Sequence, residues 1–327
     1  EKMTLFRSGE GGLERFLSFI GAGHARFLTR FESRTQPPNY FVRGTGAPER
    51  KALTAFTDPA PRLTGMKKEL IRYMRPDGVP LTGMLYLPAG YKTGERLPCL
   101  IWAYPLEYSD AGTAGQVRGS PDAFTFFRGA TPLFFVTQGY AVLMDATMPV
   151  IGDPETVNNT FVDQIVSSAK AAIDHLDSMG VIDRRRVCVS GHSYGAFMTV
   201  NLLAHSDLFA AGIARSGAYN RTLTPFGFQT ERRSFWEAKD TYMNMSPFTY
   251  ADRIKTPLLL IHGEADNNTG TFPIQSERMF QALKGTGGTA RLVMLPYESH
   301  GYSARESVLD VLAESFEWAD TYVKNRK

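Results

Sequence analysis

The sequence predicts an α/β protein in which a mostly parallel sheet is covered by helices on both faces and is preceded by short antiparallel strands. From residue 97 onward, apolar runs rich in β-branched and aromatic residues alternate with amphipathic segments of helix length. Such alternation is typical of parallel sheets with crossover helices. A hairpin pattern lies before this region, and short apolar runs broken by Gly, Pro, Asn and Ser lie before the hairpin.

Residues 1–62 are expected to form antiparallel β structure that cannot close a core alone. Short apolar runs at residues 16–20, 26–31 and 39–43 predict its strands. The prolines at residues 59 and 61 disfavour both helix and central strand, so residues 58–61 are the expected linker to a second domain at 63–327.

The second domain opens with a hairpin and continues with alternating strands and helices. Residues 68–73 and 81–87 flank a Pro-Asp-Gly turn, and this antiparallel pair is expected at one edge of the sheet. The remaining strands are predicted at residues 97–102, 141–144, 187–189, 211–214, 257–261 and 290–295. The amphipathic spacing of apolar residues predicts helices at residues 162–179, 196–204, 274–283 and 304–323.

Composition excludes several classes of function. The net charge of +3 comes from 36 basic and 33 acidic residues scattered along the chain, which does not suggest a nucleic-acid surface. No uninterrupted apolar run has the length of a membrane span. Cys99 and Cys188 each lie in an apolar run, so we expect buried core residues rather than a disulfide. The sequence begins at Glu1 without an initiator Met, and we expect a boundary within a longer protein there.

The main indication of chemistry is the motif Gly191-His192-Ser193-Tyr194-Gly195, between a strand-like run and a helix-like one. A G-x-S-x-G turn of this kind presents its serine in a strained, exposed position at the start of a helix. There the backbone N–H of Tyr194 and the helix dipole can stabilise an oxyanion. Ser193 is therefore the candidate nucleophile.

A serine nucleophile needs a general base and a carboxylate that orients it. His300 is the candidate base because it follows the last predicted strand by a short loop and precedes Gly301. The other histidines fall in the serine motif, in helices, in the N-terminal strands or at a strand end: His192, His175, His205, His24 and His262. Asp266, after the strand that ends at Gly263, is the preferred acid, with Glu264 as its competitor.

The order serine, acid, histidine, each after a strand, predicts the α/β-hydrolase fold. A second oxyanion donor is expected after the strand at 97–102, where the hydroxyl of Tyr104 stands in place of a glycine-rich HGGG segment. No metal-binding spacing and no phosphate or dinucleotide motif occurs, so no cofactor is expected.

Three motifs together resemble the prolyl oligopeptidase family of serine peptidases. They are residues 186–195 (RVCVSGHSYG), residues 262–268 (HGEADNN) and residues 300–302 (HGY), and the likeness covers about residues 65–327. The resemblance implies that Ser193, Asp266 and His300 are nucleophile, acid and base, and that Tyr104 helps to form the oxyanion hole. It also implies that residues 1–62 are the last part of a β-propeller, so the missing propeller segment or a second copy is an expected partner.

Residues 215–229 and 115–121 look most like the glutamyl endopeptidase branch of that family, known from chloroplasts and bacteria. The resemblance implies a peptide substrate cleaved after glutamate, in the bacterial cytoplasm or periplasm or in the chloroplast stroma. A guanidinium can bind a carboxylate through two parallel hydrogen bonds, so we expect Arg221, with Arg118 or Arg215, to bind that glutamate. Further expected substrate contacts are Tyr219, Phe226, Phe228 and Asn268. Each arginine could instead form a surface or structural ion pair.

Other functions remain compatible with the same motifs. A carboxylesterase uses the same triad and oxyanion geometry, as does an oligopeptidase or acylaminoacyl peptidase of different specificity. The tyrosine in place of HGGG and the propeller-like start argue against an esterase. A non-catalytic binding module that has kept the fold is the alternative outside enzymology, and the intact serine, acid and histidine argue against it.

Overall fold

The computed structural model describes residues 4, 6–47, 49–117 and 119–326. The chain divides into two compact units, one of Glu1–Leu70 with Arg118–Arg128 and one of Ile71–Val117 with Gly129–Lys327. The smaller unit therefore extends beyond the expected boundary at residue 62 and includes a segment from the loop after the strand at 97–108.

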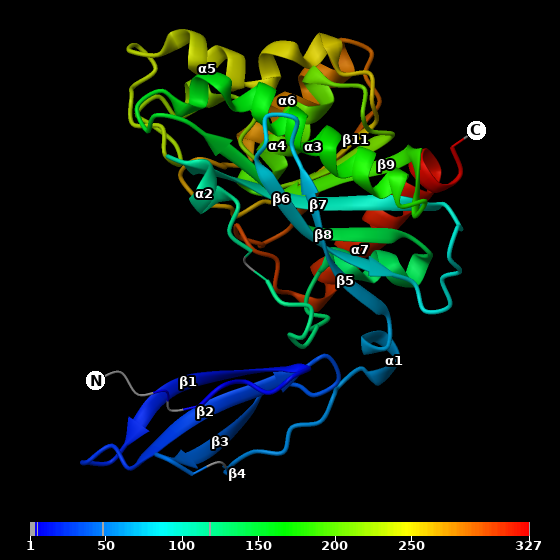
Figure 1. The fold of residues 1–327 in the computed structure, drawn as a ribbon. Helices are drawn as coiled ribbons and strands as arrows, with labels where there is room; N and C mark the ends of the chain where they lie inside the picture. The colour runs from blue at the N-terminus through cyan, green and yellow to red at the C-terminus, as the bar shows by residue number, and fades with distance from the viewer. Residues whose placement is uncertain (1–3, 5, 48, 118, 327) are drawn as a thin grey trace. The chain divides into compact units, whose positions relative to one another are not determined.

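The smaller unit is built on a four-stranded antiparallel sheet, drawn in blue in Figure 1. Its strands follow in chain order: β1 (Gly12–Ile20), β2 (Arg26–Ser33), β3 (Asn39–Gly44) and β4 (Arg50–Ala52). They include the three runs that the sequence predicts. Phe27 is fully buried in this unit, and the buried Glu14 accepts hydrogen bonds from Arg43 at 2.7 Å and Arg50 at 3.0 Å. The short helix α1 (Pro61–Thr64) follows β4.

The larger unit contains an eight-stranded sheet in the order β12-β11-β10-β9-β7-β8-β6-β5. Its strands are β5 (Lys67–Met74), β6 (Pro80–Leu87), β7 (Leu97–Tyr108), β8 (Ala141–Ile151), β9 (Ile182–His192), β10 (Ala211–Arg215), β11 (Leu258–Gly263) and β12 (Ala290–Leu295). Strands β7 to β12 pair in parallel, whereas β6 pairs antiparallel with β8. The mostly parallel sheet with an antiparallel hairpin at its edge is thus confirmed.

Helices cover both faces of this sheet. Figure 1 shows α3 (Phe161–Ser178), α4 (Tyr194–His205) and α6 (Ile274–Gly285) over one face and α7 (Arg305–Ala319) over the other. These four are the predicted helices. Shorter helical turns are α2 (Ala111–Ala114), α5 (Lys239–Met245), η1 (Pro132–Gln138), η2 (Val157–Thr160), η3 (Arg221–Leu223), η4 (Pro247–Arg253) and the π-helical η5 (Asp320–Lys324).

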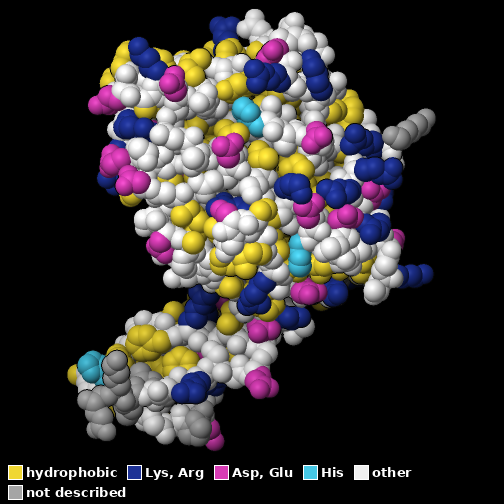
Figure 2. All heavy atoms as spheres, turned by 45° about the horizontal axis from the view of Figure 1, so that its top comes forward, with side chains coloured by type: hydrophobic (Ala, Val, Ile, Leu, Met, Phe, Trp, Pro, Cys, Tyr) yellow, Lys and Arg dark blue, Asp and Glu magenta, His cyan; other side chains and the backbone are white. Residues whose placement is uncertain are grey.

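The core lies between the sheet and its helices, and the strands that lead to the site are almost wholly buried. Cys99 on β7 and Cys188 on β9 are buried free thiols, as the sequence predicts. In the part of the chain that the structure describes, no helix is both long and apolar enough to cross a bilayer. Figure 2 shows Lys and Arg side chains intermixed with Asp and Glu over the face in view.

Candidate active site

Ser193 stands at the junction of β9 and α4 in a conformation that few residues adopt. Its backbone angles are φ 58° and ψ −118°, outside the regions that non-glycine residues favour. The backbone N–H of Ser193 donates to the carbonyl of Arg215 at 2.8 Å, and its carbonyl accepts from Phe197 at 3.0 Å. The first bond ties the turn to β10 and the second starts α4, so both neighbouring elements hold the strained residue in place.

The two glycines of the motif are required by close backbone approach. A Cβ atom on Gly191 would lie 2.3 Å from the carbonyl carbon of Gly195. A Cβ atom on Gly195 would lie 2.5 Å from the carbonyl oxygen of Ala103 on β7. Only residues without side chains let α4 begin this close to β7 and β9, which is the reason for glycine on both sides of Ser193.

Asp266 and His300, which follow β11 and β12, lie side by side. The Oδ2 atom of Asp266 is 2.9 Å from Nδ1 of His300, and Asp266 is buried. With Nδ1–H donating to this carboxylate, Nε2 of His300 is the unprotonated nitrogen of the neutral ring and is available as a base. The ring of His300 also packs against that of His192, the neighbour of Ser193, with centroids 4.8 Å apart.

The competing acid, Glu264, is exposed, whereas Asp266 accepts hydrogen bonds from several groups. The N–H of Asn268 donates to Oδ1 at 3.0 Å, and the hydroxyl of Thr271 donates to Oδ2 at 3.2 Å. The geometry therefore favours Asp266 as the partner of His300.

His262, at the end of β11, is a second imidazole against Asp266. Its Nε2 lies 2.6 Å from the carbonyl oxygen of Thr271 and 3.1 Å from Oδ2 of Asp266, and its Nδ1 lies 2.6 Å from Oγ of Ser276. Because a carbonyl only accepts, Nε2 carries the proton and Nδ1 accepts from Ser276. Burial lowers the pKa of His262, so the ring is neutral and fixes the carboxylate without adding charge.

The loop that carries His300 is shaped by close packing. A Cβ atom on Gly263 would lie 2.3 Å from the carbonyl oxygen of Ser299, which brings this loop against the end of β11. The buried carboxylate of Glu298 accepts from the backbone N–H groups of Ser303 at 3.0 Å and Ala304 at 2.8 Å. These bonds connect the histidine loop to the start of α7.

Tyr104 lies near the serine from the β7 side. Burial raises the pKa of its hydroxyl, and the side chains of Gln229 and Ser193 are among the neighbours that lower it. The amide of Gln229 donates to the same hydroxyl at 3.5 Å. The Tyr104 hydroxyl is thus beside the nucleophile, where a second oxyanion donor is expected.

A pocket of about 420 Å³ opens beside Ser193. Its walls come from the start of α4, from η3 and the loop after it, and from the loop after β11. Of the predicted substrate contacts it is lined by Arg221, Phe226, Phe228 and Asn268.

Arg221 is the charged group of this pocket, and it is buried. Its guanidinium lies 4.0 Å from the ring centroid of Phe197 and 4.2 Å from that of Phe228. Its Nε has no hydrogen-bond partner, and none of the described carboxylates forms an ion pair with it. Burial lowers the pKa of Arg221 to about 10, so it stays charged near neutral pH. A buried cation without a paired anion is costly, and such a group is suited to receive a carboxylate.

The backbone around Arg221 is fixed by neighbouring elements. The buried Gln275 of α6 accepts from the N–H groups of Tyr219 at 2.9 Å and Asn220 at 2.8 Å. The N–H of Arg221 itself donates to Oγ of Ser246 at 2.8 Å. The pocket arginine is therefore held by α6 and by the turn that follows α5.

Two of the predicted substrate contacts lie elsewhere. The guanidinium of Arg215 donates to the carbonyl of Ala130 at 2.7 Å and stacks over Trp102, in a small hollow that α7 also lines. Tyr219 is fully buried and does not line the pocket. In this structure neither side chain lines the pocket beside Ser193, because Arg215 points toward Trp102 and Tyr219 is enclosed in the core. Arg118, also predicted as a contact, lies outside the described residues.

Sequence reasoning missed several residues around the site. His262 and Thr271 contact Asp266, Gln275 fixes the pocket loop, and Glu107 on β7 accepts from the hydroxyl of Tyr194 at 2.6 Å. The spacing of His262 and Asp266, four residues apart across a turn, could have indicated their contact. Nothing in the local sequence connects Glu107 or Gln275 to the pocket.

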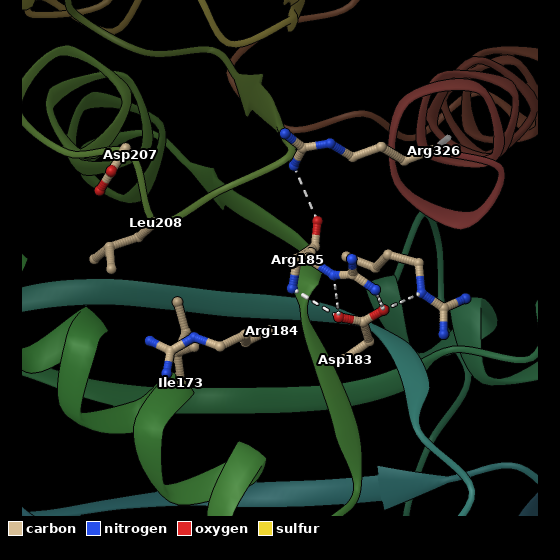
Figure 3. A pocket seen from close by; sticks show the side chains of 8 residues that line it. Ile173, Asp183, Arg184, Arg185, Asp207, Leu208 and Arg326 are labelled. Carbon is tan, nitrogen blue, oxygen red and sulfur yellow. Dashed lines mark hydrogen bonds and ion pairs between the residues drawn. The ribbon is translucent and has the colours of Figure 1, made fainter.

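A second hollow lies at the start of β9 (Figure 3), and it differs from the pocket beside Ser193 in the pairing of its arginines. Arg184, Arg185 and Arg186 line it, but each is paired with an aspartate: Asp174 and Asp177 for the first and Asp183 for the other two. Each of these three arginines is thus in a direct ion pair, whereas none of the described carboxylates is in a direct ion pair with Arg221. Among residues 4, 6–47, 49–117 and 119–326, no cluster of His, Cys, Asp and Glu is arranged to hold a metal ion.

Comparison with known proteins shows the family of this chain. The family model described as "Prolyl oligopeptidase family" matches residues 152–326, which include Ser193, Asp266 and His300. The chain belongs to the prolyl oligopeptidase family. A second family model, described as "X-Pro dipeptidyl-peptidase (S15 family)", matches residues 77–222. The membership confirms the resemblance that the sequence motifs indicate.

Two plant relatives are similar over most of the chain. Each is named "Probable glutamyl endopeptidase, chloroplastic"; the one from Oryza sativa subsp. japonica is 52% identical over 301 residues, covering 91% of this chain and 32% of the relative. The one from Arabidopsis thaliana is 52% identical over 303 residues, covering 91% of this chain and 31% of the relative. This prolyl oligopeptidase family chain thus spans about a third of the length of these relatives.

Solved structures show the same fold at low sequence identity. Porphyromonas gingivalis dipeptidyl peptidase 4 superposes with a TM-score of 0.75 at 18% identity, over 95% of this chain and 44% of that one. Pyrococcus horikoshii acylaminoacyl peptidase gives a TM-score of 0.70 at 20% identity, over 95% of this chain and 50% of that one. These likenesses establish the α/β-hydrolase fold of the larger unit.

Proposed function

We propose that this protein is a serine peptidase that cleaves peptide bonds after glutamate, with Ser193, His300 and Asp266 as its catalytic triad. The observation that carries the specificity is Arg221, a buried guanidinium without an anionic partner among the described residues, in the pocket beside Ser193. The names of the two plant relatives support the same specificity.

In the proposed reaction, Oγ of Ser193 attacks the carbonyl carbon of the scissile bond as Nε2 of His300 takes its proton. His300 then gives this proton to the leaving amine, and the C–N bond breaks to leave an ester on Ser193. A water molecule then attacks that ester as Nε2 of His300 takes its proton. The ester C–O bond breaks to release the acid product, and His300 gives the proton to Oγ of Ser193 to restore the free serine. Asp266 holds the Nδ1–H tautomer of His300 throughout, and its 2.9 Å contact supports this role.

The negative charge on the tetrahedral intermediate needs donors that are already in place. We assign these to the backbone N–H of Tyr194, at the N-terminus of α4, and to the hydroxyl of Tyr104. The location of both groups next to Ser193 supports the assignment.

In the specificity pocket, the guanidinium of Arg221 would bind the side-chain carboxylate of the P1 residue, the one before the scissile bond. Phe226 and Phe228 would pack on its methylene groups, and Asn268 would border the pocket from the loop after β11. A neutral P1 side chain would leave the buried cation unpaired, so the pocket should discriminate strongly against glutamine.

We further propose that β1–β4 form part of a β-propeller and that the hydrolase domain begins near residue 63. An antiparallel four-stranded sheet in simple chain order has the connectivity of a propeller blade. The rest of the propeller, or a second copy of the chain, is the proposed partner. The plant relatives are named as chloroplastic, and the chloroplast stroma or a bacterial cytoplasm or periplasm is the proposed location.

The experiment is a matched set of fluorogenic peptides that differ only at P1 (Glu, Asp, Gln, Pro, Lys and Ala), together with a p-nitrophenyl ester. We expect kcat/KM to be highest for Glu and turnover to be lost in Ser193→Ala. Preference for another P1 residue would contradict the glutamate specificity but keep a serine peptidase. Ester turnover without any peptide cleavage would contradict the peptidase.

A further inference from the structure

Glu107 is a carboxylate near the specificity pocket to which the proposed reaction gives no role. It lies on β7, three residues after Tyr104, and its Oε1 accepts the hydroxyl proton of Tyr194 at 2.6 Å. Burial raises the pKa of Glu107, and the nearby charge of Arg221 lowers it. The carboxylate is therefore partly desolvated and electrostatically coupled to the pocket arginine.

The side chain of Tyr194 links these two charges. Its hydroxyl binds Glu107, and its ring centroid lies 5.5 Å from the guanidinium carbon of Arg221. Glu107 and Arg221 themselves form no ion pair within 4.0 Å in the described structure, although each shifts the pKa of the other. The other groups that face Glu107 are Tyr104 on the same strand and Thr230 in the loop after η3.

The separation of Glu107 from Arg221 meets two requirements, the stability of the buried guanidinium and its availability for substrate binding. A buried guanidinium without any counter-charge is costly, but a direct ion pair would occupy the donors that a substrate needs. A carboxylate one aromatic ring away lowers the electrostatic cost of Arg221 and leaves its donors free. The same carboxylate repels any second carboxylate that enters the pocket.

We propose that Glu107 is the resident counter-ion of Arg221 and a specificity-determining residue that weakens the binding of acidic side chains and of the acidic product. This inference rests on the proposed glutamate specificity. Cleavage converts the P1 amide carbonyl into a second carboxylate, so the product carries one negative charge more than the substrate at the same site. A counter-ion beside the pocket favours its release.

The test is Glu107→Gln, which has nearly the same shape and still accepts a hydrogen bond from Tyr194. We expect the ratio KM(Gln)/KM(Glu) for matched P1 peptides to rise about three- to tenfold, the effect of removing one nearby buried charge. The inhibition constant of the Glu-ended product peptide should fall by a similar factor. Because both peptides meet the same serine and oxyanion donors, any damage to catalysis cancels in the ratio.

Glu155→Gln is the matched control, since it removes the same charge from an exposed site whose ion pair with Arg232 is 3.7 Å long. A ratio that stays at the wild-type value in Glu107→Gln, or that changes equally in Glu155→Gln, would overturn the role of Glu107. Failure of the wild-type protein to prefer Glu over Gln would instead overturn the proposed function, so the two results are distinguishable.

A second measurement does not depend on folding of the Glu107 variant. Calorimetric titration of Ser193→Ala with Glu-ended and Gln-ended peptides, near pH 6 in two buffers of different ionisation enthalpy, gives the protons taken up on binding. An entering carboxylate raises the pKa of Glu107, so the Glu-ended peptide should take up more protons than the Gln-ended one. Equal proton uptake by the two peptides would contradict the proposal.

Discussion

At the scale of single residues, Asp266 links most of the groups in the candidate site. It contacts His300, His262 and Thr271 through Oδ2 and the N–H of Asn268 through Oδ1. These contacts hold the carboxylate in a single orientation, and the orientation selects the Nδ1–H tautomer of His300. In the proposed reaction, Asp266 therefore keeps Nε2 of His300 unprotonated.

Asp266→Asn should keep the fold and lower kcat by about 10³- to 10⁴-fold, because an amide can hold His300 in the wrong tautomer. The measurement is kcat on the best P1 peptide, with circular dichroism to verify folding. Glu264→Gln is the control two residues earlier, and we expect it to change kcat by less than about twofold because Glu264 is exposed. Equal losses in the two variants would contradict the assignment of the acid.

His192 provides a prediction about stability. Burial, with smaller effects from Arg215 and His300, lowers the pKa of His192 to about 3. The unfolded chain, whose histidine titrates near pH 6.5, then binds more protons than the folded one between about pH 6.5 and pH 3. The free energy of unfolding should therefore fall as the pH falls through this window.

Urea unfolding at pH 5, 6 and 7 measures this dependence. In His192→Gln the free energy of unfolding should fall less steeply as the pH falls. The slope should be smaller by up to about 1.4 kcal/mol per pH unit, which corresponds to about one proton. Burial also lowers the pKa of His262, so a part of the pH dependence of the free energy of unfolding should remain in His192→Gln. Parallel curves for the variant and the wild-type protein would show that His192 is not held neutral.

The residue scale is also where the sequence is least informative. Arg215 is the last residue of β10 and Arg221 comes six residues later, and each could line the pocket on sequence grounds. In the structure Arg215 stacks on Trp102 beside α7, whereas Arg221 packs on Phe197 of α4. Which face a side chain takes after a strand end depends on a few backbone angles in the loop, and no local pattern encodes them.

At the scale of elements, the strand, turn and helix around Ser193 form a rigid unit that was predictable from the sequence. The second half of β9 is a buried run that contains Val187 and Val189, α4 is buried on almost all sides, and the glycines stand where backbone approaches backbone. The strands β7 to β12 and helices α3, α4, α6 and α7 were equally predictable, because long periodic patterns depend little on distant contacts. The loops after β10 and β11, which build the pocket, are held by distant groups such as Gln275.

Gly191→Ala and Gly195→Ala should each lower the free energy of unfolding by more than about 2 kcal/mol, because the new Cβ would lie within 2.5 Å of backbone atoms that cannot move freely. Gly285→Ala, at the end of α6, is the control, because its Cβ meets nothing within 4 Å. There we expect a change of less than about 1 kcal/mol in the stabilising direction. Urea unfolding measures all three, and equal stability of the three variants would contradict the packing argument.

At the scale of the whole molecule, the smaller unit exposes apolar surface. Phe16, Leu17 and Phe19 on β1 are 42%, 42% and 40% exposed, and the rings of Phe16 and Phe19 pack 5.1 Å apart. Figure 2 shows hydrophobic side chains at the surface of this unit. Apolar residues grouped on an edge strand favour association with another chain or another copy.

Phe19→Glu should weaken self-association by at least about tenfold in dissociation constant, because a charge replaces apolar surface at the contact. Sedimentation velocity over a concentration series measures it. Ser18→Glu adds the same charge to the neighbouring exposed residue and should have a smaller effect. A chain that is monomeric at all concentrations would refute the prediction.

The measurement that tests the central claim most directly is the ratio of kcat/KM for matched Glu and Gln peptides in the wild-type protein and in Arg221→Met. Methionine keeps apolar contact with Phe197 and Phe228 but removes the charge. We predict that the wild-type protein prefers the Glu peptide by at least about 100-fold in kcat/KM and that the variant loses this preference. The loss should come mainly from a lower kcat/KM for the Glu peptide. A variant that still prefers Glu as strongly as the wild-type protein would contradict the assignment of Arg221 as the group that selects the substrate.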